Sequence, residues 1–311
     1  MGQAYARRVP ESRKGLLLGT SAYLLWGLFP IYWPLLRPAG ALEILAHRVL
    51  WSLVTMGLLV LVLRRTTHLR AFLGNRRLLA LLALSAATVT ANWALYIWGV
   101  NNGRVVETSL GYFINPLVTV LMGVVLLGER LRRPQWAAMG VGLLAVVVLT
   151  LDYGRLPWIA LALAFSFGTY GLAKKTADVG AVEGLAFETM LIAPFALAYL
   201  GWLAATGAST FTSEGAGHAA LLMTTGIVTA VPLICFGAAA TRIPMVSIGL
   251  LQYLAPVLQF GFGVFYFDEA MPAGRWVGFA LVWVALMAFT WDALRHRRRQ
   301  LALSVAGATA A

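Results

Sequence analysis

The sequence has few of the side chains on which soluble domains and most enzymes depend. Of its 311 residues only 12% are charged and 60% are hydrophobic, whereas soluble domains carry roughly 25% charged residues. Its one cysteine, Cys235, cannot form a disulfide within the chain and lies in an apolar run, as a small buried hydrophobe does. The four histidines are scattered and have neither metal-ligand nor catalytic-triad spacing. We therefore expect no metal, no cofactor and no catalytic residues.

Long apolar runs are abundant instead. A spanning helix needs about 20 apolar residues, since about 30 Å of hydrocarbon is crossed at about 1.5 Å per residue. The pattern predicts an all-α integral membrane protein with ten transmembrane helices, at 15–36, 42–63, 78–99, 105–127, 134–151, 156–172, 184–205, 218–239, 246–267 and 275–293. Pro30 and Pro34 predict a kink in the first helix. We interpret the connector 206–217 as an ordinary surface loop.

The basic residues lie between the apolar runs. A net charge of +12 would suggest nucleic acid as the partner of a soluble protein, but here it indicates topology and a lipid bilayer as partner. If the N-terminus is cytoplasmic, the inside segments hold 19 Lys and Arg residues and the outside segments hold 4. Both termini are therefore predicted to be cytoplasmic, as a basic arm at 1–14 and a basic tail at 294–311.

An internal repeat appears when the sequence is shifted by 140 residues. Pro116 then falls on Pro256 and Trp136 on Trp276, and the register holds without a gap to Asp152 and Asp292; Glu129 likewise falls on Glu269. We interpret this as a duplication that gives repeats at 15–152 and 153–293. Because each repeat has five helices, an odd number, the two are predicted to be inverted in the membrane, as in many secondary transporters.

Polar residues near the centres of two helices are the first candidates for a substrate site. Tyr112 and Thr119 match Gln252 and Gln259 in the repeat register, and each pair is seven residues apart on one face. Asn115 lies beside them, and Pro116 and Pro256 free backbone carbonyls nearby. Two interpretations stay open: hydrogen bonds that hold helices together, or contacts with substrate. Asn92 and Tyr96, four apart on the third helix, are further candidates for lining a cavity.

A second group, Glu43, His47 and Arg48, lies near the predicted outer end of the second helix. Glu43 and His47 share a helix face. A structural ion-pair network is one interpretation, and gating or proton handling is the other. Glu188 lies near a predicted helix end, where a carboxylate can be solvated or paired.

Several motifs resemble those of the RarD family, in the EamA branch of the drug/metabolite transporter superfamily. They are EILAHR at 43–48, SLGYFINPL at 109–117, GERL at 128–131, AAATR at 238–242 and QYLAP at 252–256. The resemblance covers nearly all of 15–292. It implies ten helices, two EamA repeats and transport of a small molecule across the bacterial inner membrane, with no established substrate but a name linked to chloramphenicol sensitivity. One departure is Phe267-Asp268-Glu269, where the first repeat has Leu127-Gly128-Glu129.

We therefore predict a secondary transporter that moves a small metabolite or drug-like molecule by alternating access, with export as the expected direction. The alternatives from other classes are a membrane-embedded enzyme acting on a lipid-linked substrate and a receptor or scaffold without transport. The sequence has no Gly-x-x-x-x-Gly-Lys-Ser/Thr motif, which argues against ATP as the driving force. Substrate, coupling ion and oligomeric state stay open, a homodimer included.

Overall fold

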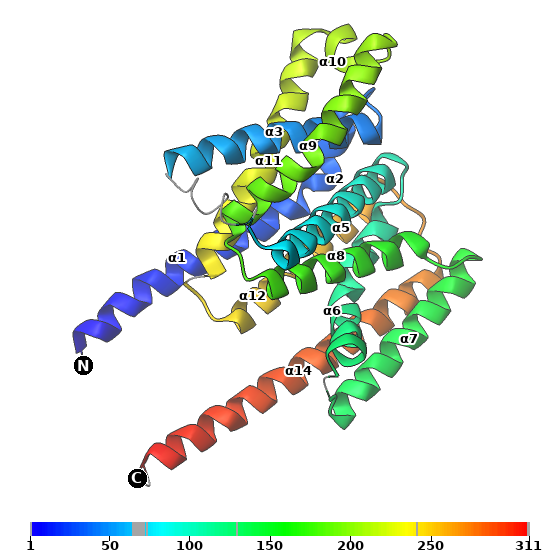
Figure 1. Ribbon diagram of the computed structural model, residues 1–311. Coiled ribbons are helices and arrows are strands. Elements are labelled where there is room, and N and C mark those ends of the chain that lie inside the picture. The colour runs from blue at the N-terminus through cyan, green and yellow to red at the C-terminus, as the bar shows by residue number, and fades with distance from the viewer. Residues whose placement is uncertain (1, 64–71, 73, 129, 241, 310–311) are drawn as a thin grey trace. The chain divides into compact units, whose positions relative to one another are not determined.

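The computed structural model describes residues 2–63, 72, 74–128, 130–240 and 242–309, all of whose regular elements are helices (Figure 1). Within these residues, nine helices are long and apolar enough to cross a membrane. The predicted span 156–172, the sixth along the chain, is present as the helix α8 (Trp158–Ala177) but is not among these nine. Lys174 and Lys175 in its last turn lower its mean hydropathy. The all-helical membrane class is thus confirmed, while the count of ten spans stays a prediction.

The chain divides into two compact units, and each draws on both halves of the sequence. Unit 1 contains residues 1–109 and 166–269, and unit 2 contains residues 110–165 and 270–311. Unit 1 holds the helices that carry the buried polar groups described below. The predicted repeats at 15–152 and 153–293 are continuous segments, so neither repeat coincides with a unit.

The centre of unit 1 is α3 (Ala41–Val62), which packs against α9 (Ala181–Ala205) and α11 (Gly215–Ala240) (Figure 1). α5 (Arg76–Asn101) packs on α9 and α3, and α1 (Gly2–Gly27) packs on α11. Close approach depends on small residues. A Cβ added to Gly226 of α11 would overlap the Trp51 carbonyl of α3 and lie 2.8 Å from Thr55 Oγ1. Small residues at helix crossings are the usual means of tight packing within a membrane.

The first predicted helix is broken where its prolines lie. α1 ends at Gly27, α2 covers Phe29–Tyr32 and the 3₁₀ turn η1 covers Trp33–Leu36. Pro30 and Pro34 each occupy the first turn of a new helix, where the missing N–H group is not needed. The predicted kink is confirmed. At the other end, α1 continues through the predicted basic arm to Gly2, just as the last helix, α14 (Ala273–Thr309), continues through the basic tail.

The ninth predicted helix is also divided. α12 (Met245–Leu251) and α13 (Leu254–Gly261) are separated at Gln252 and Tyr253, and the π-helical turn η2 (Phe262–Tyr266) follows. Pro256 lies in the first turn of α13, so it removes no intrahelical donor there. Gln252 therefore lies at a break between two helices instead of at the centre of one.

The Glu269 side chain caps the N-terminus of another helix, α6 (Val105–Leu127). The Glu269 carboxylate accepts hydrogen bonds from the backbone N–H groups of Val105 and Val106, the latter at 2.9 Å. These donors have no partner within the helix, and a carboxylate suits the positive end of its dipole. Asp268 has φ +50°, and Gly128, its match in the repeat register, has φ +68°. The turn is thus kept because aspartate tolerates left-handed backbone; Glu129 lies outside the described residues.

In unit 2, α7 (Arg133–Tyr153) and α14 pack side by side in antiparallel directions (Figure 1). Arg132 at the start of α7 pairs with Asp292 of α14 at 2.5 Å, and Arg275 near the start of α14 pairs with Asp152 of α7 at 3.1 Å. The two ion pairs are reciprocal. Such an exchange is what a two-fold relation between the fifth and tenth helices produces, and Asp152 and Asp292 are matched residues of the predicted repeat.

The connector 206–217 differs from the expected plain loop. It contains the short helix α10 (Thr210–Ser213), and Ser209 before it is 5% exposed. α10 packs against α11, and Thr210 Oγ1 lies 2.9 Å from His218 Nε2. Most of the connector is exposed, as expected of a surface segment, but it is not a plain loop, because Thr210 has hydrogen-bonding partners on α3 and α11.

Candidate functional site

A narrow pocket lies between α3, α5 and α9 of unit 1. Its lining combines aliphatic side chains, one indole, two hydroxyls and one carboxylate: Val49, Val89, Thr90, Trp93, Leu185, Glu188, Thr189 and Ile192. In this state the side chains leave essentially no room for even a water molecule between them. Ligand pockets usually measure roughly 300–1,000 Å³, so a substrate can enter only if the three helices move apart.

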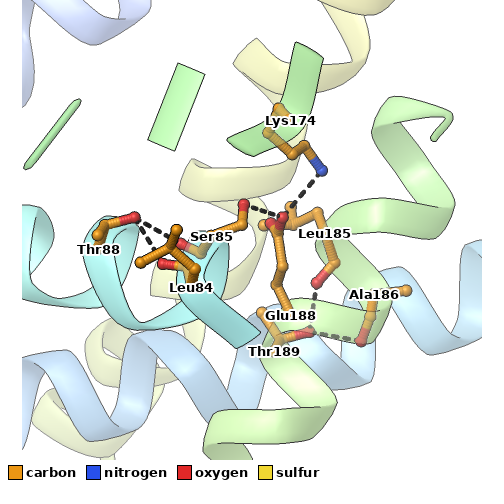
Figure 2. Close-up of polar contacts among 8 residues, drawn as sticks. All are labelled: Leu84, Ser85, Thr88, Lys174, Leu185, Ala186, Glu188 and Thr189. Carbon is orange, nitrogen blue, oxygen red and sulfur yellow. Dashed lines mark hydrogen bonds and ion pairs between the residues drawn. The ribbon is translucent and has the colours of Figure 1, made fainter. Parts of the chain in front are cut away.

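The Glu188 carboxylate is the central polar group of this pocket. The residue is 1% exposed. Its Oε1 atom accepts a hydrogen bond from Ser85 Oγ of α5 at 2.5 Å and lies 3.0 Å from Lys174 Nζ of α8 (Figure 2). No described residue donates a hydrogen bond to Oε2. A buried carboxylate oxygen without a donor is costly, and a native protein retains such an atom for a reason.

Lys174 reaches this carboxylate from the last turn of α8. Its side chain is 18% exposed, against 2% for that of Glu188. The ammonium group passes over Gly184, one turn before Glu188 on α9, where a Cβ would overlap Nζ. Nζ makes no hydrogen bond of good geometry in the described part of the chain, so the pair is held by charge alone. Removing one partner of a buried pair leaves an uncompensated charge and typically costs about 3–5 kcal/mol.

Arg48 of α3 packs against the ring of Trp93, one of the residues that line the pocket. Its guanidinium carbon is 3.9 Å from the Trp93 ring centroid and 5.0 Å from that of Trp33, and Nε donates to Thr229 Oγ1 of α11 at 3.0 Å. Arg48 is 3% exposed. Cation–π contacts of desolvated groups are worth about 2 kcal/mol or more. The arginine therefore orients the indole that forms one wall of the pocket.

The structure separates the predicted group of Glu43, His47 and Arg48. All three are buried, but Glu43 Oε1 accepts a hydrogen bond from the Thr210 backbone N–H at 2.8 Å. The His47 ring stacks on Phe211 with centroids 4.8 Å apart. Glu43 and His47 thus contact α10, whereas Arg48 extends to Trp93 and Thr229. A joint role for the three stays a prediction.

The polar residues predicted near the centres of the fourth and ninth helices have different surroundings. Gln259 Nε2 donates to the Trp26 carbonyl of α1 at 3.1 Å, and Gln259 is 4% exposed. On α6, Tyr112 and Asn115 are half-buried and Thr119 is exposed. Gln252 is half-buried at the helix break. Whether these residues contact substrate or only hold helices together stays a prediction.

The two candidates on α5 are buried. Asn92 precedes Trp93, is 1% exposed and donates from Nδ2 to Ser166 Oγ of α8 at 3.0 Å. Tyr96 is 2% exposed one turn further along. Asn92 therefore joins α5 to α8, and whether the two residues line a cavity stays a prediction.

Sequence reasoning missed the central pair of this site. Lys174 was interpreted only as a topology signal, and Glu188 only as a residue near a helix end. A signal was present, since Glu188 is a lone carboxylate in the apolar run 184–205 and an ionisable residue within a span is a functional candidate by default. Its partner could not be identified, because Ser85 and Lys174 come from two other helices.

Comparisons with known proteins agree with this membrane architecture. Residues 13–151 match the model of the EamA-like transporter family. The chain is 59% identical over 292 residues to protein RarD of Streptomyces exfoliatus, covering 94% of this chain and 93% of that protein. It is 43% identical to protein RarD of Escherichia coli, covering 93% of this chain and 98% of that one.

A solved crystal structure has a similar fold, with a TM-score of 0.55 and 20% sequence identity over 88% of this chain and 96% of that chain. This likeness concerns the fold alone. The sequence identity to the two RarD proteins shows the family, because it is 43% or higher and extends over more than nine-tenths of both sequences. The chain is a multi-pass membrane protein, and it belongs to the RarD family of EamA-type transporters.

Proposed function

We propose that the protein is a secondary transporter that moves a small metabolite or drug-like molecule across the bacterial inner membrane by alternating access, in the direction of export. The observation that carries the proposal is the buried Glu188 carboxylate, which faces a pocket between apolar helices and has an oxygen without a donor in the described residues. Ionisable groups within spans are rare and mark substrate or ion pathways.

Alternating access is supported by three features of the chain. The 140-residue register relates two runs of five predicted helices, which inverts one against the other. Arg132–Asp292 and Arg275–Asp152 form reciprocal ion pairs between α7 and α14. Gly128 and Asp268 share left-handed backbone at matched positions. We infer ten spans, with α8 as the sixth. We also infer that Tyr112 and Gln252 contact the substrate while the two halves move relative to each other.

Transport is tested with the full chain in sealed vesicles. Purified protein is reconstituted and assayed against a panel of radiolabelled metabolites and antibiotics, with and without a pH gradient. At least one compound should cross faster than in vesicles without protein, and Glu188→Leu should abolish the difference. If no compound of a broad panel crosses faster in well-folded preparations, the transporter proposal loses its support.

Topology gives a separate prediction. With ten spans and both termini in the cytoplasm, a reporter active only in the cytoplasm should work when fused after Arg299. A reporter active only outside the cytoplasm should work when inserted near Ser209, because the inside segments carry 19 basic residues and the outside segments 4. The same two reporters exchanged between the sites serve as controls. Activity of the exchanged pair would contradict the ten-span model.

A further inference from the structure

The two oxygens of the Glu188 carboxylate differ: Oε1 has a hydrogen-bond donor and a cation beside it, whereas Oε2 has no donor among the described residues. Ser85 Oγ and Lys174 Nζ both approach Oε1, and no described residue bonds Oε2. The residue is 1% exposed, and it lines the pocket. Leaving a buried charged acceptor unsatisfied is costly, since the group loses its hydration without a replacement. The site therefore has room in its hydrogen bonding for a donor that the described residues do not supply.

The rest of the pocket defines what kind of donor fits. Val89, Leu185 and Ile192 form apolar walls, and Trp93 contributes an aromatic face. The Thr189 hydroxyl donates to the carbonyls of Leu185 and Ala186 in its own helix, so it offers no donor to the pocket (Figure 2). A carboxylate beside an indole and aliphatic groups complements an ammonium group on an apolar body.

Lys174 already presents such a group to the carboxylate. Its ammonium on a four-carbon stem is a primary alkylammonium, and it holds Oε1 without a well-directed hydrogen bond. Its partial exposure and its place in the last turn of α8 let the stem swing outward and keep the charge in water. Gly184 is required for the inward position, because a Cβ there would overlap Nζ.

We propose that Glu188 binds the protonated amine of an organic cation with an apolar or aromatic body, and that the Lys174 ammonium occupies this site in place of the ligand until the ligand displaces it. The proposal rests on the proposed function, since it names the substrate class of a transporter. An anion is disfavoured because the cations near the pocket already have contacts, Lys174 with Glu188 and Arg48 with Thr229 and Trp93.

The test uses 2-phenylethylammonium as probe, with neutral 2-phenylethanol and the anion 3-phenylpropionate as matched controls of similar size. Binding is measured on the purified full chain in detergent at pH 8 as a concentration-dependent rise in Tm. The ammonium should raise the Tm of the unmodified protein, while the alcohol and the carboxylate should not. Glu188→Gln, which keeps size but removes the charge, should abolish the response.

Two further variants should strengthen binding of the ammonium probe instead of abolishing it. Lys174→Met removes the competing ammonium, and Gly184→Ala displaces it while both charged residues remain. Each should bind the probe more tightly, by roughly tenfold for each 1.4 kcal/mol of competition removed. A purely structural ion pair predicts otherwise, because Glu188→Gln and Lys174→Met would then both lower the Tm and neither would change the probe's affinity.

The outcomes separate this proposal from the transporter proposal. Weaker binding in Lys174→Met and in Gly184→Ala would overturn the displacement scheme. A Tm rise with 3-phenylpropionate that is lost in Lys174→Met would place an anion site at Lys174 instead. Amine binding without transport of any compound would support the amine site and contradict the proposed function. Transport of a compound without any response to the ammonium would support the proposed function and contradict the amine site.

Discussion

Gly226→Ala is expected to lower the free energy of unfolding by about 2–3 kcal/mol, which is at the upper end of what overpacking costs. The added methyl would overlap the Trp51 carbonyl carbon and oxygen, which are backbone atoms that cannot turn aside, and would press on Thr55 Oγ1. α3 and α11 must therefore separate. The change is measured by titration with a denaturing detergent, followed by far-ultraviolet circular dichroism.

The separation should also affect the site. Arg48 and Thr229 join the same two helices one turn from Trp51 and Gly226, so moving the helices apart breaks the Arg48–Thr229 hydrogen bond and reduces transport. Gly57→Ala is the matched control, because it lies on α3 with no atom within 4 Å of its added Cβ. Alanine favours a helix over glycine by about 1 kcal/mol, so this control should be neutral or stabilising. Equal stability of the two variants would contradict the close approach of α3 and α11.

Arg48→Met is expected to lower transport of an identified compound by about 10- to 100-fold. The substitution keeps much of the side-chain volume but removes the planar cation that lies 3.9 Å from the Trp93 ring centroid, together with the hydrogen bond to Thr229. A charge-assisted hydrogen bond contributes about 1.5–3 kcal/mol, and losing that amount corresponds to a rate about 10- to 100-fold lower. Initial rates in reconstituted vesicles, normalised to the amount of folded protein, give the measurement.

Two controls accompany this variant. Arg48→Lys keeps the charge but not the plane, so it should recover only part of the rate. Arg104 also faces a tryptophan of α5, with its guanidinium carbon 5.5 Å from the Trp98 ring centroid, but its side chain is 37% exposed. Its contact with Glu107 is long, at 3.7 Å between Nη1 and Oε2. Arg104→Met should therefore change the rate by less than about threefold. A normal rate in Arg48→Met would remove Trp93 and Arg48 from the transport site.

Most of the helices could be predicted from the sequence because apolar length is a local property. The second, fourth and seventh predicted spans lie within a few residues of α3, α6 and α9. Proline chemistry is local as well, and the break between α1 and α2 is where Pro30 indicates it. The division at Gln252 was missed because the run 246–267 contains no charged residue and Pro256 lies in the helix after the break.

The candidate site was predicted less well. Asn92 precedes the pocket residue Trp93 in the chain, and Arg48 packs on the Trp93 ring, but their partners could not be inferred from spacing along one helix. Glu43 and His47 are close to Arg48 in sequence, and yet they contact α10 at Thr210 and Phe211. Neighbours on a helix differ by about 100° in direction, so adjacent residues face different helices. Only the packing of those helices decides which polar groups meet.

The amino-acid sequence alone is enough to show that this chain crosses a membrane many times and that its two halves share a 140-residue register, and it predicts that the basic residues favour one side. These properties follow from the free energy of burying apolar residues in lipid, which each segment satisfies separately. The tertiary structure decided that Glu188 of α9 meets Ser85 of α5 and Lys174 of α8. It also decided that Glu188 lines the pocket and that one of its carboxylate oxygens has no donor among the described residues. Such a site depends on distances between three helices, and these exist only once the helices have packed.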